Sequence, residues 1–387
     1  MLRSLLTFSL PALKLVFALC LCISPALEAQ ATSHLGADGK SKSAVRIKST
    51  RSPEADALFN QLKSQMGKGI LFGHQNATLY GRGWHSAKGA PPDSCDIKES
   101  TGCYPAVYGW DFNTIWNPMV PESKIPQKLA HLRSLIKKAS KRGGIHAFSW
   151  HMWNPVTKQN FYDTTPAVKH ILPGGNKHEW FKKELRRIAD FFRSLKDDRG
   201  NPIPVIFRPF HEHNLKCFWW SLAHCSKKQH SQLFEFTVRH LRDHLGVRNA
   251  LYAISPSGKS IHSQEDYLSI APDLDLVDVL GIDYYDISNK QPVKVLEHVV
   301  RLSKKYNKIA ALTECGYKKG LGEAPHDYYT QNFLKPFKNS SLAKEIAFCM
   351  VWQNASAESY WIPVKGDPHL KDFLNFCRDP FIILRKD

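Results

Sequence analysis

The chain has 387 residues, of which 43% are apolar and 23% charged, a balance typical of a folded globular protein. Lysine and arginine number 53 against 35 acidic residues, which gives a formal charge of +18. The pattern excludes collagen, a coiled coil and a protein with several membrane spans, because no short repeat occurs and only one apolar run is long. Length alone allows two or three domains, or one barrel of about 250 residues or more.

The long apolar run lies at the start of the chain, where Arg3 and Lys14 precede Leu15–Ile23. Small residues at positions 29–31 match the site that a signal peptidase reads, so we predict a secretory signal over 1–31, cleaved near Ala31. A membrane anchor is the alternative, but it needs about 20 apolar residues, and Lys14 interrupts the run. We therefore expect a secreted protein, extracellular or periplasmic, without stable membrane insertion.

Residues 32–52 are small, polar and basic, with five Lys/Arg against one Asp, which predicts a flexible arm. No second linker follows, so 53–387 is expected to form one domain. Seven cysteines remain after the signal, and their spacings match no zinc template. Two pairs, Cys95/Cys103 and Cys217/Cys225, are each eight residues apart, and oxidation of an exported chain would close a loop at either pair.

Eight short apolar runs alternate with amphipathic stretches along this domain, which predicts parallel β/α units. Eight units fit a (β/α)8 TIM barrel. A doubly wound sheet is the alternative, but no glycine-rich phosphate turn follows the first run. The predicted strands are 69–73, 104–109, 145–149, 204–208, 250–254, 277–282, 309–313 and 346–351. The predicted helices include 122–142, 178–196, 228–245, 291–305 and 326–337.

In such a barrel the active site lies at the carboxyl ends of the strands, so we looked at the residues that follow each run. Acids, histidines and tryptophans recur there far more often than random placement would give. The candidates are His74, Asp111, Trp150, His151, Arg208, His211, Asn214, Asp283, Tyr285 and Trp352.

Two further carboxylates, Glu212 and Glu314, follow the fourth and the seventh predicted strands. Glycoside hydrolysis with retention needs two carboxyl groups about 5–5.5 Å apart, and these two strand ends face each other across a barrel mouth. One carboxyl must be protonated to help the leaving oxygen depart, while the other must be ionised to attack the anomeric carbon. The alternative is a structural ion pair with Arg208 or a nearby lysine.

Tryptophans on or just beyond the strand ends fit a sugar ligand, because pyranose faces stack on flat apolar rings. Core packing is the alternative for each ring, and Phe218 and one of Trp219 and Trp220 are candidates for it. Tyr285 lies two residues beyond Asp283, so both would face the mouth and the phenol could orient a nucleophile. The tryptophans in question are Trp150, Trp153, Trp219, Trp220 and Trp352.

Seven blocks, in order and over most of 53–380, give the chain a resemblance to glycoside hydrolase family 26, whose best-known members are endo-β-1,4-mannanases. The blocks are GILFGHQNATLYG (69–81), YPAVYGWDF (104–112), FSWHMWNPVTKQNFYD (148–163), RPFHEHN with FWW (208–220), DVLGIDYY (278–285), LTECG (312–316) and VWQNA (351–355).

The resemblance implies a (β/α)8 barrel that cleaves β-mannan with retention, with Glu212 as acid/base and Glu314 as nucleophile. It also implies that His151, His211, Asp283, Tyr285 and Trp352 line the subsite of the reacting sugar. No cofactor and no catalytic metal are expected, and His211 and His213 beside Glu212 have poor spacing for a metal. We expect a monomer whose partner is mannan or a related polysaccharide.

Nucleic acid is not expected as a partner, because the basic residues of 137–142 and 182–187 fall on the polar faces of predicted helices. The chain departs from the usual family pattern at Leu215, Cys217 and Gln353. These changes leave two alternatives open: the same chemistry on mixed-linkage β-glucan or β-1,3-xylan, and an inactive carbohydrate-binding barrel.

Overall fold

The computed structural model describes residues 50–91, 93–285 and 291–387, so the predicted signal and most of the predicted arm lie outside the described residues. The last residues of the predicted arm belong to the folded unit. The Ser52 hydroxyl accepts a hydrogen bond from the Ala55 N–H and caps helix α1 (Pro53–Gln65), and Arg51 pairs with Asp56 at 2.7 Å.

Eight parallel strands form a closed barrel in the described part of the chain, which confirms the predicted fold class. Each strand pairs with the next in sequence, and β10 pairs with β1 to close the ring, with Leu71 opposite Phe348 and His74 opposite Val351. The strands are β1 (Ile70–Gln75), β4 (Val107–Asp111), β5 (Ile145–Trp150), β6 (Val205–Pro209), β7 (Ala250–Ile254), β8 (Val279–Tyr285), β9 (Ile309–Gly316) and β10 (Phe348–Val351). Each overlaps a predicted apolar run.

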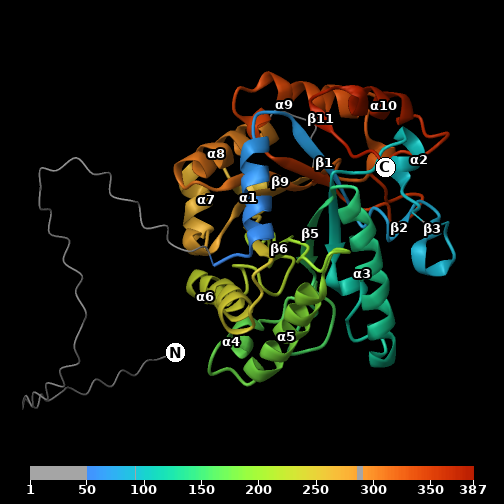
Figure 1. Cartoon of the computed structure of the whole chain (residues 1–387). Coiled ribbons are helices and arrows are strands. Elements are labelled where there is room, and N and C mark those ends of the chain that lie inside the picture. Colours follow the sequence, from blue (N-terminus) through green and yellow to red (C-terminus); the bar gives the residue numbers. More distant parts are fainter. Residues whose placement is uncertain (1–49, 92, 286–290) are drawn as a thin grey trace, which may run out of the picture. The chain divides into compact units, whose positions relative to one another are not determined.

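Helices on the outside of the strands cover the barrel, and their apolar residues recur at helical spacing (Figure 1). The π-helical turns His240–His244 and Tyr328–Leu334 extend α6 and precede α9. The helices that follow α1 are α2 (Asp96–Thr101), α3 (Ile125–Lys141), α4 (Val168–Ile171), α5 (His178–Ser194), α6 (Lys227–Arg239), α7 (Gln264–Ile270), α8 (Gln291–Lys305), α9 (Lys335–Asn339) and α10 (Leu370–Arg378).

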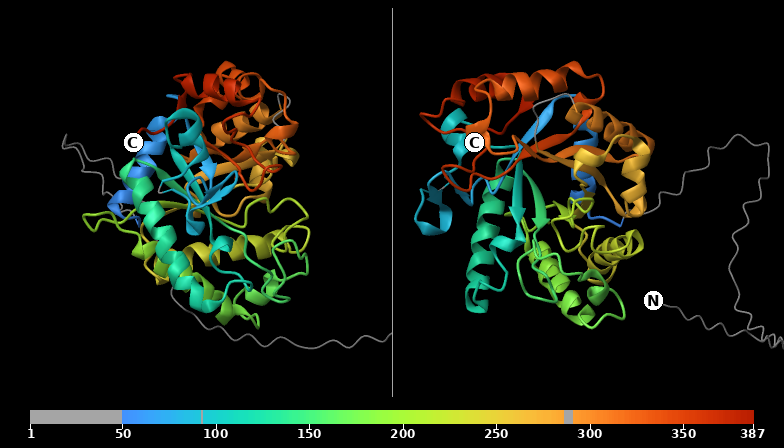
Figure 2. Two further views of the ribbon diagram at one scale, coloured as in Figure 1. Left: turned by 90° about the vertical axis from the view of Figure 1, so that its right-hand side faces the viewer. Right: turned by 180° about the vertical axis from the view of Figure 1, so that it is seen from behind.

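The side chains of each strand alternate between the barrel interior and the helix layer, as the two-residue period of a strand requires. Val107, Ile206 and Met350 belong to the interior cluster, and Leu58 and Leu62 of α1 close this cluster at the amino ends of the strands. Figure 1 shows α1, in blue, beside the strands, and the left view of Figure 2 shows the barrel from the right-hand side of Figure 1. Because α1 covers the amino ends, a site is expected at the carboxyl ends of the strands.

Small elements complete the described structure. The hairpin of β2 (Tyr80–Gly81) and β3 (Trp84–His85) follows β1, and β11 (Ile382–Ile383) adds parallel pairs to β1. The seven cysteines of the described residues are all thiols, so neither loop-closing bond left open by the spacing is formed. Among the described helices, none is both long and apolar enough to cross a membrane.

Candidate active site

The interior positions near the carboxyl ends of the strands carry polar groups in place of apolar ones. Ser149 lies two residues beyond the interior Ala147, Arg208 two beyond Ile206, and Ser255 two beyond Ala253. Because side chains two apart on a strand share a face, these groups point into the same end of the barrel. The polar layer is buried, with Arg208 only 2% exposed.

A β-bulge in β9 sets the position of Glu314. The register runs from Ile282–Leu312 directly to Asp283–Glu314, so Thr313 is an extra residue of β9. The Thr313 hydroxyl lies 2.7 Å from Asp283 Oδ1, and a side chain at Gly281 would come within 2.6 Å of it. The bulge therefore lets Thr313 bind Asp283 while Glu314 reaches the mouth.

Both oxygens of Glu314 are held by donors, one from buried Arg208 and one from partly buried Tyr285. Arg208 Nη2 donates to Oε1, and the Tyr285 phenol donates to Oε2 at 2.9 Å. The other arm of Arg208 donates to Asp283 Oδ2 at 2.7 Å and to Ser255 Oγ at 2.8 Å. Burial opposes the charge of Arg208, but Asp283 and Glu314 raise its pKa above the ordinary value. Glu314 is therefore an oriented carboxylate beside a permanent cation.

Glu212 lies in a different environment, on the loop that follows β6. Its backbone is left-handed (φ 50°), as is that of Phe210 (φ 55°), and its N–H donates to the Ser255 carbonyl at 2.8 Å. Left-handed conformations are unfavourable for residues other than glycine and are found at functional sites when the surroundings hold them. Burial, and then the charges of Asp283 and Glu314, raise the pKa of Glu212 well above its usual range.

The two carboxyl groups are thus different in the way that double displacement requires. The raised pKa of Glu212 favours its acid form, and its side chain remains partly accessible at the mouth. Glu314 is held as an acceptor by Arg208 and Tyr285. The same layer can therefore supply a proton from one side and a nucleophile from the other.

A chain of hydrogen bonds orients two predicted histidines. Asp111 accepts from Ser149 Oγ at 2.6 Å and from His151 Nδ1 at 2.5 Å, so His151 Nε2 is left as an acceptor. His211 Nε2 lies 3.1 Å from it and donates. Burial, and then His151 and Arg208, lower the pKa of His211 well below its usual value, so it stays neutral. Asp111 therefore acts through His151.

Trp219 and Trp220, predicted to bind sugar, are fully buried, which corrects that prediction. The Trp219 indole N–H donates to the Met152 carbonyl at 2.8 Å, and that of Trp220 donates to the His211 carbonyl at 2.9 Å. Trp220 also stacks on Phe218, with centroids 4.5 Å apart. Both rings pack beneath the loop that carries Glu212 and fix it there.

The side chains of His74 and Trp150 were predicted to lie at the mouth. Each instead faces the helix layer, because it occupies an outward-facing position of its strand. Trp150 stacks on Phe181 of α5, with centroids 6.2 Å apart and planes 7° apart. The inward neighbour of His74 is Gln75, whose oxygen would lie 2.0 Å from a side-chain carbon at Gly109. Burial lowers the pKa of His74 to about 4. Neither side chain reaches the mouth.

Asn214 and Trp352 lie at the mouth in different roles. Asn214 uses both ends of its amide on the loop after β7: Nδ2 donates to the Ser257 carbonyl at 2.8 Å and to Ser260 Oγ at 2.7 Å, and Oδ1 accepts from the Ser257 N–H at 2.8 Å. Trp352 is partly exposed and its ring lies 5.8 Å from that of His151. Trp352 is therefore placed to contact a sugar, whereas Asn214 holds a loop.

Tyr162 is an aromatic residue of the mouth that we did not predict. Its ring is stacked on Phe218, with centroids 5.6 Å and planes 12° apart, and 59% of the residue is exposed. Partial burial, and then the charges of Cys217, Glu212 and Glu314, raise the pKa of the Tyr162 phenol. The Phe-Tyr-Asp end of the block at 148–163 was the available signal. Ser149 and Thr313, small polar residues inside strands, and Ser255, directly after β7, were also missed.

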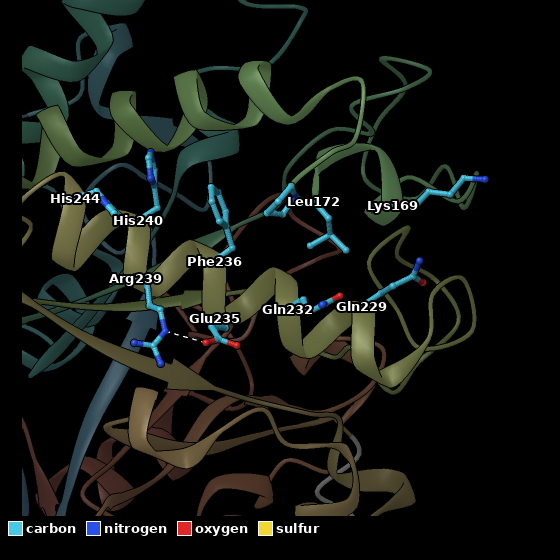
Figure 3. A pocket seen from close by; sticks show the side chains of 10 residues that line it. Lys169, Leu172, Gln229, Gln232, Glu235, Phe236, Arg239, His240 and His244 are labelled. Carbon is cyan, nitrogen blue, oxygen red and sulfur yellow. Dashed lines mark hydrogen bonds and ion pairs between the residues drawn. The ribbon is translucent and has the colours of Figure 1, made fainter. Parts of the chain in front are cut away.

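Other groups in the described residues lie away from this mouth. A groove of about 510 Å³ between α4 and α6, lined by Leu172, Gln232, Phe236 and His240, contains none of the predicted site residues (Figure 3). No cluster of three or more His, Cys, Asp or Glu side chains in the described ranges has the arrangement to hold a metal ion.

Comparison with known proteins matches the chain to one family of glycosyl hydrolases. Residues 47–346 match the profile of glycosyl hydrolase family 26. A mannan endo-1,4-beta-mannosidase of Bifidobacterium adolescentis is 34% identical over 371 residues, which cover 87% of this chain and 36% of that protein. The chain thus spans about a third of the length of that relative.

Solved structures agree with this match. A Cellulomonas fimi endo-beta-1,4-mannanase double mutant superposes with a TM-score of 0.81 at 34% identity, over 87% of this chain and 76% of that one. The family 26 beta-mannanase BoMan26A of Bacteroides ovatus superposes with a TM-score of 0.76 at 35% identity, over 86% and 95% of the two chains.

Proposed function

The chain belongs to glycosyl hydrolase family 26, and from this membership we propose that it cleaves internal β-1,4-mannosidic bonds of mannan-type polysaccharides with retention of configuration. The observation that carries the proposal is the contrast between two carboxyl groups in one polar layer. Glu314 is fixed by Arg208 and Tyr285, whereas burial and neighbouring negative charge raise the pKa of Glu212.

In the first step, Glu314 attacks the anomeric carbon while the bond from that carbon to the glycosidic oxygen breaks. Glu212 gives its proton to the leaving oxygen, so the departing chain leaves as an alcohol and Glu212 becomes a carboxylate. The product of this step is an ester between the sugar and Glu314. Arg208 and Tyr285 hold the attacking carboxylate in place, which lowers the cost of orientation.

In the second step, Glu212 accepts a proton from water, and the water oxygen attacks the same carbon. The bond from the sugar to Glu314 breaks, and the sugar leaves with its original configuration. Glu212 is returned to its acid form and Glu314 to its carboxylate form. Asp111 orients His151, and His151 in turn orients His211, so the two rings keep their positions beside the reacting sugar in both steps.

Replacement of the nucleophile tests the assignment directly. We expect Glu314→Ala to fold and to lose mannan hydrolysis. With an activated aryl β-mannoside, added azide should restore cleavage and give a product of inverted configuration, because azide occupies the space of the carboxylate. Wild-type turnover in this variant, or an azide product of retained configuration, would reject Glu314 as the nucleophile.

The substrate is a second question, because the chemistry would also serve other β-glycans. Gln353 is fixed by the Asn76 amide at 2.7 Å and by the Tyr80 phenol, so a specific polar cluster lies beyond β10. A reducing-sugar assay on mannan, glucomannan, barley β-glucan and β-1,3-xylan decides between the substrates. The proposal requires the highest kcat/KM on mannan or glucomannan. Preference for barley β-glucan or β-1,3-xylan would move the activity to that polymer.

We also propose that the enzyme is exported and acts as a monomer outside the cytoplasm. The support for export is the charged and then apolar sequence that ends in Ala29–Ala31. Amino-terminal sequencing of the exported protein should start near Thr32, and light scattering after gel filtration should give the mass of one mature chain. An intact Met1 on exported protein would reject the cleavage.

A further inference from the structure

A second pocket in the described structure lies outside the polar layer of the active site and is rich in tryptophan. It has a volume of about 580 Å³ and is lined by Trp116, Trp150, Trp153 and Trp180, which we name the tryptophan pocket. Trp116 and Trp150 are buried, and Trp153 and Trp180 are partly exposed. Trp150 faces outward from β5, away from the catalytic mouth, and lines this pocket instead.

The two partly exposed rings offer flat faces whose positions are held. The Trp153 indole N–H donates to Asn113 Oδ1 at 2.8 Å, which fixes the orientation of that ring. Trp180 lies on α5, a rigid helix of 17 residues. Oriented aromatic rings beside a concave surface are the usual partners of pyranose faces, because the axial C–H groups of a sugar pack on the ring.

The charged residues of the pocket are unevenly paired. Arg187 is neutralised by Glu122, at 3.0 Å, and by Glu184, at 3.7 Å. Three lysines also line the pocket and form no ion pair within the described part of the chain; they are Lys158, Lys177 and Lys183. The pocket therefore has an excess of positive charge beside its aromatic faces.

The loop that carries Lys158 is built to hold it in place. Asn154 Oδ1 accepts the N–H of Val156 at 2.9 Å, and the Asn154 carbonyl accepts the N–H of Lys158 at 2.9 Å. Lys158 itself has a left-handed backbone, with φ 62°. A left-handed backbone is unfavourable in a residue with a side chain, so the loop contacts must offset this cost.

We propose that the tryptophan pocket is a second carbohydrate site, which binds a chain of acidic sugars without cleaving it. Pyranose rings would stack on Trp153 and Trp180, and sugar carboxylates would pair with Lys158, Lys177 and Lys183. Charge complementarity decides the ligand class, because only an acidic glycan would form ion pairs with the three lysines. Such a site would retain the enzyme on an acidic polysaccharide matrix that also contains its substrate.

The test measures binding of full-length mature protein to polygalacturonate, by affinity electrophoresis and by calorimetry, with neutral mannan as the second probe. The double variant Trp153→Ala/Trp180→Ala should bind polygalacturonate about tenfold more weakly or worse, as expected when stacking worth about 1.4 kcal/mol is lost. The triple variant Lys158→Gln/Lys177→Gln/Lys183→Gln should lose as much and show a smaller dependence on salt. Hydrolysis of short mannooligosaccharides should be unchanged in the triple lysine variant.

A matched control separates the pocket from the general positive charge. The triple variant Lys227→Gln/Lys228→Gln/Lys371→Gln removes the same charge from exposed lysines outside the pocket, and it should keep wild-type affinity. Equal losses in the two triple variants would overturn the proposal, as would unchanged binding after removal of both tryptophans. Stronger binding of neutral mannan to the pocket would also overturn it. None of these results depends on activity, so failure here leaves the hydrolase assignment intact.

Discussion

Asp283 of β8 and Glu314 of β9 are register partners, although the two strands shift by one residue immediately before them. The shift is made by Thr313, and the partners share Arg208, which donates to both carboxylates. The extra residue brings both carboxylates to the guanidinium at the mouth. The bulge, rather than a regular pairing of the two strands, therefore sets the position of the nucleophile Glu314.

Thr313→Val should impair catalysis while leaving the shape of the core almost unchanged. The variant loses the hydroxyl that lies 2.7 Å from Asp283, and a buried carboxylate oxygen left without this donor costs about 1–3 kcal/mol. We expect a lower free energy of unfolding and a kcat that falls about tenfold. Thr313→Ser keeps the hydroxyl and should restore kcat. Equal kcat in both variants would show that the hydroxyl is not needed.

Glu212→Gln should separate the acid role from the nucleophile role. Loss of general acid catalysis should lower turnover of mannan by about 10² to 10⁴. The loss should be smaller with a dinitrophenyl β-mannoside, whose leaving group needs no proton. In the wild type, the raised pKa of Glu212 puts the alkaline limb of kcat/KM above the ordinary range of a glutamate, and that limb should disappear in the variant. An unchanged alkaline limb would exclude Glu212.

Arg208→Lys tests whether one cation must reach two carboxylates. The guanidinium binds Asp283 through Nη1 and Glu314 through Nη2, whereas an ammonium is a compact charge that lacks this fork. We expect folded protein with kcat lowered at least tenfold. Arg208→Met should be worse, with a loss of about 3–5 kcal/mol in stability, because two buried carboxylates lose their partner. Chemical denaturation and steady-state kinetics measure the two effects.

Trp220 and Trp352 should respond differently to removal. Trp220 is fully buried, so Trp220→Ala should lower stability by about 3–5 kcal/mol. Trp352 is partly exposed beside His151, so Trp352→Ala should leave stability nearly unchanged and raise KM. Thermal unfolding and kinetics on mannopentaose separate the two outcomes. A KM effect without loss of stability in Trp220→Ala would return that ring to the substrate.

Buried histidines should make the fold sensitive to acid. Burial lowers the pKa of His213 to about 4 and that of His146 to about 3, and His230 is also lowered well below its usual value. The unfolded chain binds these protons near pH 6.5, so the contribution of the neutral histidines to the free energy of unfolding is fully present above that pH. It is lost as pH falls toward 4, by up to roughly 1.4 kcal/mol per pH unit for each histidine.

Urea unfolding at several pH values tests this expectation. His230→Phe removes one buried histidine and should flatten the fall between pH 6 and 4.5. His262→Phe alters an exposed histidine and should leave the curve as it is. If the free energy of unfolding falls equally with pH in wild type and in His230→Phe, then His230 does not contribute to the acid sensitivity.

The sequence predicts the eight barrel strands and both carboxylates because apolar runs and rim residues follow simple periods. It does not predict which way a rim residue points. His74 and Trp150 face outward, whereas their chain neighbours Gln75 and Ser149 face the barrel interior. The bulge at Thr313 is another such case, since it depends on pairing across strands. Helix α1 was missed because its apolar positions, Ala55, Leu58 and Leu62, are sparse.

Local sequence also does not decide which aromatic residues reach the mouth. Trp219 and Trp220 have the composition of a sugar platform, but their indole N–H groups bind main-chain carbonyls. Tyr162 reaches the mouth through stacking on Phe218, a contact between loops that local sequence does not encode.

The seam between β1 and β10 joins segments made almost 280 residues apart, the pair Leu71 and Phe348 being 277 positions apart. During synthesis, β1 and its growing sheet present an unpaired edge until Phe348–Val351 exists. An open edge of apolar strands invites pairing with other chains. Proteolysis or truncation before β10 should therefore yield aggregates instead of a smaller enzyme, and the last strand protects solubility as well as the ring.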